Sequence, residues 1–204
     1  MNEENNAKNI IFNALLKRNP ILVSGAVIAP VVITANCISN ALTLAAAFSV
    51  ITFFTLLVSS FVPKNIVYSI RIILYILIGA LVYVPSAIMF RYLIPDSIEA
   101  LGIFFPLLIA NGMIIFRSEA IFFQESKGHM IIDIIFSIIG YDAAVILYGL
   151  VREILGRGTV GGTIIGMPFV LPALDNQFGG FLLLGLMAAL TRVVVLTIKR
   201  MGQK

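Results

Sequence analysis

The residues Pro30-Val-Val-Ile-Thr-Ala-Asn36 and Pro106-Leu-Leu-Ile-Ala-Asn111 form a broken pattern that occurs twice within strongly apolar sequence. Proline leaves a backbone carbonyl without its helical partner, and asparagine carries an amide that lipid cannot satisfy. Such interruptions persist in a membrane where neighbouring helices cover them or where they line a site. Because the two patterns lie about half a chain apart, they indicate two related halves with a site near the bilayer midplane.

The composition around these patterns is that of an integral membrane protein. Of the 204 residues, 60% are hydrophobic and only 12% are charged, against about 45–50% apolar and 25% charged residues in a soluble domain. No charged residue occurs between Asn19 and Pro63. At about 1.5 Å per residue this run gives roughly 67 Å of helix, enough for two crossings of an apolar layer about 30 Å thick.

Four further apolar runs each have the length of a spanning helix. The sequence therefore predicts an all-α integral membrane protein with six transmembrane helices, an inverted three-plus-three repeat and interrupted first and fourth helices. It divides the chain into a cytoplasmic segment 1–18, a single membrane domain 19–198 and a tail 199–204, and we expect no cleaved signal. The four runs are Ile72–Phe90, Ala100–Phe116, Ile131–Val151 and Phe178–Ile198.

The distribution of Lys and Arg over alternate loops predicts the orientation. Ten of these residues fall on one side and three on the other, which places both termini in the cytoplasm of a bacterial or archaeal cell. The chain has no basic stripe with stacking aromatics, so the charge gives no indication of nucleic-acid binding. The larger set is Lys8, Lys17, Arg18, Lys64, Arg71, Arg117, Lys127, Lys199, Arg200 and Lys204; the smaller is Arg91, Arg152 and Arg157.

The two asparagines, Asn36 and Asn111, and the acid Asp142 are the candidates for a midplane site or ion path. Small residues and prolines also serve ordinary helix packing, but the repetition of the break favours a site. An ionisable group such as Asp142 near the bilayer centre is by default a functional-site hypothesis, and the alternative is a hydrogen-bonded carboxyl between helices. Asp133, nine residues earlier, lies on the opposite helix face near the cytoplasmic interface, where we expect a solvated or capping role.

Three other polar residues have simpler interpretations. Arg192 is close enough to the cytoplasmic end of its span to snorkel, or it pairs with an acid such as Asp142. His129 stands alone in a charged loop, where we expect solvent exposure. Cys37 is the only cysteine, which excludes an internal disulfide and a cysteine-only metal site within the chain.

The segment Arg152-Glu-Ile-Leu-Gly-Arg-Gly-Thr-Val-Gly-Gly162 is glycine-rich but is not a phosphate-binding loop. It lacks the Gly-Lys-Ser/Thr sequence and a preceding strand. We interpret it as the start of a flexible outward loop that continues to Asn176 and is placed to contact a partner protein.

Several of these segments together resemble one known family. They are Asn19-Pro20, Ala100-Leu-Gly-Ile-Phe-Phe-Pro-Leu-Leu-Ile-Ala-Asn111, Arg117-Ser-Glu-Ala120, Asp133 and Arg152-Glu-Ile-Leu-Gly156. The chain resembles the E subunit of the Rnf electron-transport complex and its relative, the D subunit of the sodium-translocating NADH:quinone reductase. The resemblance implies a six-helix subunit paired with a homologous subunit of inverted topology, similar to the A subunit of Rnf, in a complex whose other subunits carry flavins.

The resemblance also implies a cofactor that this chain is not equipped to share. In the family, a cysteine in each half-helix break contributes to an intramembrane 2Fe–2S cluster held between the two homologous subunits. Here Ala29 and Gly112 occupy those positions, and neither can ligate iron. Cys37 lies eight residues beyond Ala29, about 12 Å along a helix, and one thiolate cannot replace two.

Three alternatives stay open for the cofactor: a partner that holds a cluster with other ligands, another cofactor, or a fold kept for a purpose without electron transfer. The sequence predicts a membrane subunit of an Rnf-like ion-translocating electron-transport complex that is non-catalytic alone and binds no cofactor by itself. The alternative function is a vitamin- or flavin-capturing subunit of an energy-coupling-factor-type transporter. A purely structural scaffold is the third.

Overall fold

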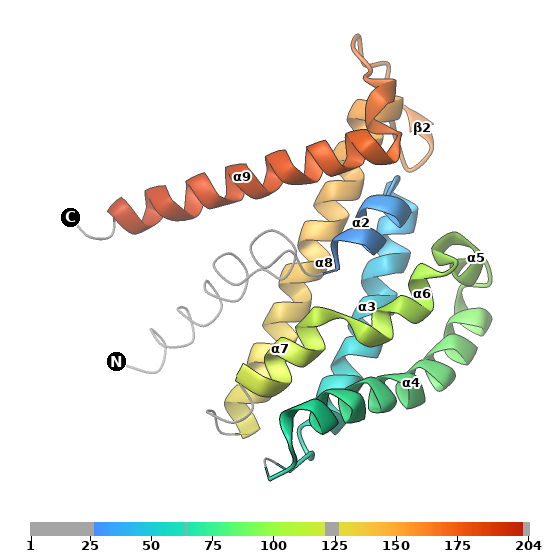
Figure 1. The fold of residues 1–204 in the computed structure, drawn as a ribbon. Helices are drawn as coiled ribbons and strands as arrows, with labels where there is room; N and C mark the ends of the chain where they lie inside the picture. The colour runs from blue at the N-terminus through green and yellow to red at the C-terminus, as the bar shows by residue number, and fades with distance from the viewer. Residues whose placement is uncertain (1–26, 64, 121–126, 202–204) are drawn as a thin grey trace.

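The computed structural model describes residues 27–63, 65–120 and 127–201, which are mostly helical (Figure 1). Within these residues, four helices are long and apolar enough to cross a membrane. The predicted helical membrane architecture is confirmed apart from one short β-hairpin, whereas the six-helix count and the inverted relation between halves stay predictions. The four helices are α3 (Ile38–Ser59), α4 (Tyr68–Leu93), α8 (Lys127–Arg157) and α9 (Gln177–Met201).

The predicted spans differ from these helices in two places. The first crossing falls largely on residues 19–26, outside the described residues, and only its end is seen as the short helix α2 (Ile28–Thr34). The fourth span, predicted as Ala100–Phe116, is divided into short pieces rather than one interrupted helix, because a left-handed Gly102 and the extended Asn111 stop helical hydrogen bonding. The pieces are α5 (Ser97–Leu101), α6 (Phe104–Leu107), the 3-10 turn η2 (Leu108–Ala110) and α7 (Gly112–Ala120).

The centre of the molecule is the antiparallel pair α3 and α8, whose buried side chains form most of the core (Figure 1). Phe48 and Tyr141 stack there with ring centroids 3.5 Å apart. Further along, a Cβ added at Gly149 would lie 2.5 Å from the Cβ of Ala41, so only a glycine permits this approach. In lipid, where burial of apolar surface does not drive helices together, such small-residue contacts supply the packing energy.

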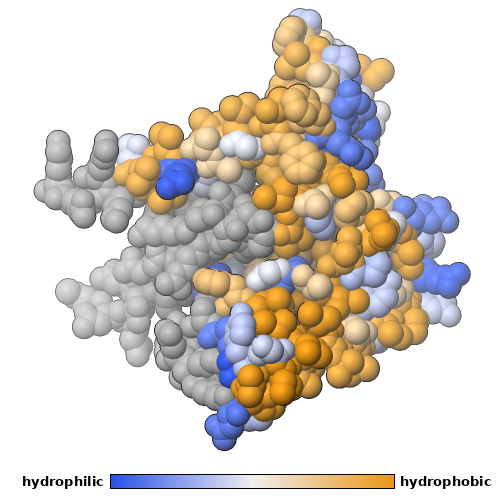
Figure 2. Space-filling model, viewed as in Figure 1, coloured by the Kyte–Doolittle hydropathy of each residue, from blue (hydrophilic) through white to orange (hydrophobic). Residues whose placement is uncertain are grey.

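The other elements surround this pair. Helix α4 runs beside α3, and the chain from α6 to α7 crosses over α3 toward the start of α8 (Figure 1). Helix α9 packs on the end of α8 only near its own first turns, and from there it leads away toward the left of Figure 1. The visible face is mainly hydrophobic, with hydrophilic residues near β2, near α5 and at the lower edge (Figure 2). This distribution suits a protein that faces lipid or other apolar helices.

A local pattern repeats at the two breaks. Each short helix, α2 and α6, follows closely on a residue with positive φ, Val27 at 61° and Gly102 at 50°. Each then carries its proline, Pro30 or Pro106, at its third position. A proline in a first helical turn removes an N–H group that has no helical partner there. Each proline therefore lies in the first turn of a short helix, and the chain leaves the helical conformation both before it, at Val27 or Gly102, and after it, near Asn36 or Asn111.

Candidate functional site at the helix breaks

The first break lies between α2 and α3, over residues 35–37. Asn36 is half-buried there, and its side-chain oxygen accepts a hydrogen bond from Asn40 Nδ2 at 2.9 Å. Cys37 precedes the first residue of α3 and is also half-buried. The break therefore exposes the carboxyl end of one helix and the amino end of another inside the protein, and both ends need partners.

Two neighbouring residues of α8 supply these partners. The buried guanidinium of Arg152 donates to the Val32 carbonyl near the end of α2. The carboxylate of Glu153 accepts the Ile38 N–H at the start of α3 at 2.8 Å. A cation at a helix carboxyl end and an anion at a helix amino end each complement the partial charge of that end. Arg152 and Glu153 thus neutralise both sides of one break.

The same two residues organise the segment that follows α8. Arg152 also donates to the carbonyl oxygens of Leu174, Asp175 and Asn176, at 2.9, 3.0 and 3.2 Å. Glu153 also accepts bonds from Thr159 Oγ1 and Gly162 N–H, both at 3.1 Å. Both residues are only 2% exposed, so the two charged side chains at the centre of this network are buried.

The glycine-rich segment is therefore folded, which corrects its interpretation as an open loop. Residues up to Arg157 belong to α8, and strands β1 (Thr159–Val160) and β2 (Thr163–Ile164) form a tight antiparallel hairpin. Gly161 and Gly162 supply the two positive φ values, 57° and 82°, that such a two-residue turn requires. A 3-10 turn, η3 (Pro172–Leu174), leads into α9.

The second break lies at Asn111, between η2 and α7. Asn111 is buried and caps α7 itself, because its Oδ1 accepts the Ile114 N–H at 3.1 Å. Its Nδ2 donates to the Leu108 carbonyl at 2.8 Å and to Thr52 Oγ1 of α3 at 3.2 Å. The single side chain of Asn111 therefore binds the backbone on both sides of this break, as Arg152 and Glu153 do together at the first break.

Helix α7 is held on both sides by ion pairs from the segment Arg117-Ser-Glu-Ala120. Arg117, only 1% exposed, pairs with Asp133 of α8. Glu119 pairs with Arg71 of α4 at 2.5 Å and accepts a hydrogen bond from Tyr75 at 2.8 Å. The solvated role expected for Asp133 is wrong: the carboxylate is 8% exposed because Arg117 holds it against α7.

These pairs also alter the charge count behind the predicted orientation. Arg71, Arg117, Arg152 and Arg157 lie in helices and bind protein partners, so they are not loop cations. Of the thirteen Lys and Arg residues counted, eight stay on the predicted cytoplasmic side and one, Arg91, on the other, so the asymmetry persists.

The positions at which the family cysteines are expected, Ala29 and Gly112, are both exposed at the surface. Ala29 offers only a methyl group and Gly112 no side chain, so neither fits an iron–sulfur cluster. Among the described residues, no three Cys, His, Asp or Glu side chains are grouped as metal ligands. Positions 29 and 112 therefore lack the thiolates that the resemblance implies.

Asp142 lies in the middle of α8 and faces α3. Its Oδ2 accepts a hydrogen bond from Ser49 at 2.5 Å, whereas its buried Oδ1 has no partner within the described part of the chain. The carboxyl borders an apolar groove of about 360 Å³ between α3 and α8, lined among others by Phe53, Ile135 and Ile139. Arg192 is exposed on α9 and makes no ion pair with Asp142.

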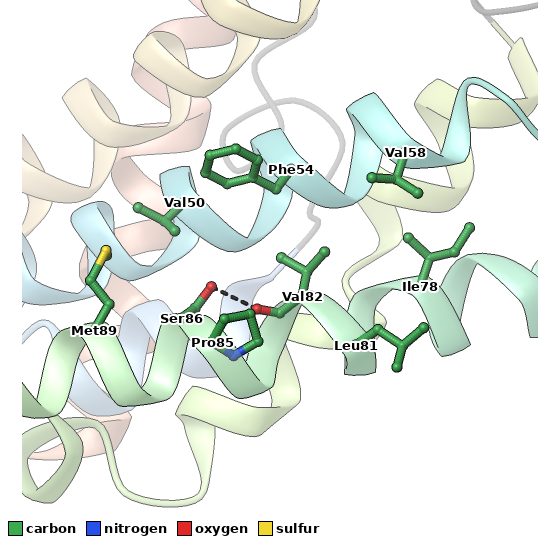
Figure 3. A pocket seen from close by; sticks show the side chains of 9 residues that line it. All are labelled: Val50, Phe54, Val58, Ile78, Leu81, Val82, Pro85, Ser86 and Met89. Carbon is green, nitrogen blue, oxygen red and sulfur yellow. Dashed lines mark hydrogen bonds between the residues drawn. The ribbon is translucent and has the colours of Figure 1, made fainter.

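A second groove, of about 440 Å³, lies between α3 and α4 and shares Val50 and Phe54 with the first (Figure 3). It is lined almost only by apolar side chains, such as Phe54 and Met89. Its one hydroxyl, on Ser86, is already bonded to the Val82 carbonyl at 2.8 Å (Figure 3). This groove offers no polar recognition and is suited to an acyl chain or an apolar helix.

The predicted site residues do not form one cluster. Asn36, Asn111 and Asp142 each have separate partners, and no hydrogen bond between them occurs within the described residues. The prediction for His129 concerns a side chain outside those described. Sequence reasoning missed Ser49 and Thr52, which carry no signal in an apolar run, and it assigned Arg152 and Glu153 to a loop.

Comparison of the sequence with known proteins identifies the family of this chain. The chain matches the family described as "Rnf-Nqr subunit, membrane protein" over residues 7–196. It is 33% identical to the E subunit of the ion-translocating oxidoreductase complex of Shewanella amazonensis, with 93% of this chain and 88% of the relative covered. Identity is 30% to the protein of that name from Shewanella frigidimarina, over 96% and 91% of the two chains. It is 28% to the one from Pasteurella multocida, over 92% and 90%. The protein is therefore a member of the Rnf-Nqr family of membrane subunits.

Proposed function

We propose that this chain is the E-type membrane subunit of an Rnf-like, redox-linked ion-translocating electron-transport complex. The family membership and the names of the relatives support this assignment. The observation that carries it is the construction of the two breaks: each is clamped by buried polar residues, yet Gly112 beside the second break and Ala29 in the first turn of α2 lie at the surface. Rigid breaks with exposed edges suit a centre shared with a second subunit.

The partner in this proposal is a homologous subunit of inverted topology, similar to the A subunit of Rnf, beside flavin-carrying subunits. The chain sits in the cytoplasmic membrane with both termini in the cytoplasm. Because Ala29 and Gly112 provide no ligand atoms, we propose that this chain contributes nothing to the standard 2Fe–2S cluster. Electron transfer then depends on the partner or on a different cofactor.

Asp142 is the proposed ion-path residue. A carboxyl with one hydroxyl partner and one unpartnered oxygen, at the edge of a groove between membrane helices, can exchange a proton or a small cation. Ser49 positions its Oδ2. Asn36 and Asn111 shape the breaks on either side, and Arg192 has no assigned contact to this path.

The family match favours the redox complex over the vitamin-capturing transporter subunit. That alternative requires a polar recognition site in a pocket. The groove between α3 and α4 is apolar, and the groove at Asp142 has two polar side chains only.

Affinity purification of the tagged full chain from its native membrane tests the complex. We expect mass spectrometry to find flavin-carrying subunits and a homologous membrane subunit in stoichiometric amounts. Recovery of a pair of ATPase subunits instead, or of the chain alone after mild solubilisation, would overturn the proposal.

Labelling with dicyclohexylcarbodiimide, which reacts with protonated carboxyl groups in apolar surroundings, tests Asp142. We expect modification at Asp142 that falls as pH or cation concentration rises. Asp133 on the same helix is the internal control, because its carboxylate is paired with Arg117 and should stay unmodified. Equal labelling of both acids, or none at Asp142, would exclude the proposed exchange.

A further inference from the structure

Buried hydroxyl groups gather on one side of the contact between α3 and α8. On α3, Thr52, Thr55 and Ser59 are at most 2% exposed, and on α8, Ser137 and Tyr141 are fully buried. Their spacing of three or four residues places each set on a single helix face. The contact is therefore polar along one stretch within an otherwise apolar core.

Three contacts of the antiparallel pair fix the register of these rows: Ser49 with Asp142, Phe48 with Tyr141, and Ala41 with Gly149. The two residue numbers of each pair sum to 189–191, as expected where one helix ascends while the other descends. The same register places Ser137 at a level between Thr52 and Thr55, and Asp133 at a level between Thr55 and Ser59, so the two rows occupy the same stretch of the pair.

Helix α7 closes the third side. At one end, Asn111 binds Thr52, and at the other, Arg117 binds Asp133. Ser118, which is 1% exposed, adds another hydroxyl group. From Thr52 to Ser59 the rows extend about 10 Å along the helix axis. We call this region, defined by Thr52, Thr55, Ser59, Ser118, Ser137 and Tyr141, the hydroxyl track.

Five of these six hydroxyl groups have no hydrogen-bond partner within the described part of the chain: those of Thr55, Ser59, Ser118, Ser137 and Tyr141. A helical Ser or Thr in a membrane ordinarily bonds to the carbonyl four residues earlier. Thr34, Ser86 and Thr191 do so here, at 2.7–2.8 Å. The hydroxyls of the track do not, although a buried polar group without a partner is unfavourable.

We propose that the hydroxyl track holds a file of ordered water molecules that connects the break at Asn111 with the Arg117–Asp133 ion pair. A buried water molecule typically binds several polar groups that otherwise have no partner. The hydroxyl groups of the track are such groups. A continuous file of water and hydroxyl groups passes protons between its two ends. The file runs from the break beside Gly112 toward the predicted cytoplasmic side, and Asp142, the neighbour of Tyr141 on α8, is not one of its members.

Silver-ion modification of single cysteines in the full chain, in lipid nanodiscs, tests the proposal. The background is Cys37→Ser, and the test variants are the near-isosteric Ser59→Cys, Ser118→Cys and Ser137→Cys. Ala47→Cys and Ala144→Cys are the controls, since both positions are buried, at 0% and 6% exposed, on the helices that carry Ser59 and Ser137. Only a hydrated thiol forms the reactive thiolate readily, so we expect track positions to react at least about tenfold faster than controls. Equally slow reaction at all five positions would mean a dry track and overturn the proposal.

Hydroxyl-radical footprinting of the unaltered protein gives an independent readout. Tyr141 and Tyr148 lie two turns apart on α8, and both are 0% exposed. The Tyr148 hydroxyl is bonded to the Gly180 carbonyl at 3.0 Å, whereas Tyr141 belongs to the track. Radicals formed from bound water should oxidise Tyr141 faster than Tyr148. Equal protection would contradict the water file, without bearing on the partners or on Asp142.

Discussion

Arg152 and Glu153 are adjacent in the sequence but bind opposite ends of one helix break. Because successive residues of a helix point about 100° apart, the pair on α8 reaches the end of α2 and the start of α3 simultaneously. Charge-assisted bonds of this kind are stronger than neutral ones. The break is therefore stabilised by side chains distant in sequence.

Substitution Arg152→Met should leave four carbonyl oxygens without their donor. Each bond to a charged group contributes about 1.5–3 kcal/mol, so we expect a clear fall in the thermal midpoint of the detergent-solubilised protein. Arg157→Met, which removes an exposed pair with Asp175, is the control and should cost less than about 1 kcal/mol. A midpoint for Arg152→Met equal to that of the control would contradict the role assigned to this residue.

The buried pair of Arg117 and Asp133 predicts a pattern of non-additive effects. Arg117→Met alone leaves a buried carboxylate unpaired, which costs about 3–5 kcal/mol. The double variant Arg117→Met/Asp133→Leu removes both charges and should recover much of that loss. Denaturant unfolding of the wild-type, single and double variants measures the coupling. Additive losses would show that the two residues do not stabilise each other.

At this scale the sequence indicates which residues are unusual but not their partners. The asparagines and prolines stand out because lipid tolerates them poorly, and both breaks occur beside them. The sequence predicts a solvated or capping role for Asp133 and a loop position for Arg152, because each lies near the end of an apolar run. Only the packing of α7 and η3 reveals that protein groups surround them.

Among the described elements, α3 and α8 make the most extensive helix–helix contact. Their closest contact is at Gly149, where any side chain would meet Ala41 and the Cys37 carbonyl. The lengths of α3, α4, α8 and α9 follow from the apolar runs, because about 20 apolar residues suffice to span the bilayer. The division of the fourth span into α5, α6, η2 and α7 follows instead from the backbone at Gly102 and Asn111, which hydropathy does not report.

Gly149→Ala should force α8 away from α3 and destabilise the protein, since overpacking of a tight contact costs about 1–3 kcal/mol. Ala41→Gly in the same chain should restore part of the stability by removing the clashing Cβ. Gly185→Ala on α9, where nothing lies within 4 Å of the added Cβ, is the matched control. If Gly149→Ala and Gly185→Ala had the same effect on the thermal midpoint, the close approach would not exist.

For the whole molecule, the exposed positions Ala29 and Gly112 belong to the surface that we propose faces the partner subunit. Gly112 is not among the described glycines with positive φ, so a cysteine is tolerated there by the backbone. If the partner presents two cysteines, Ala29→Cys/Gly112→Cys should rebuild a four-thiolate site and add a reducible cluster signal to the complex. Ala29→Ser/Gly112→Ala should add none. No new signal from the cysteine variant would contradict a centre shared across this surface.

The family could be predicted from sequence motifs because they specify rare polar residues at fixed distances in an apolar chain. Neither the sequence nor the structure of a single chain identifies the partner, the cofactor or the relation between the two halves. This is why the breaks could be located from the sequence, whereas their function requires the assembled complex.

Electron paramagnetic resonance of the reduced native complex, with iron and acid-labile sulfide measured in the same sample, tests the central claim most directly. The comparison is a complex from cells that lack this chain, so that other clusters are subtracted. We predict that no cluster signal depends on this chain, because Ala29 and Gly112 have no ligand atoms. A cluster that is present with the wild-type chain and lost without it, while the other clusters persist, would contradict the account.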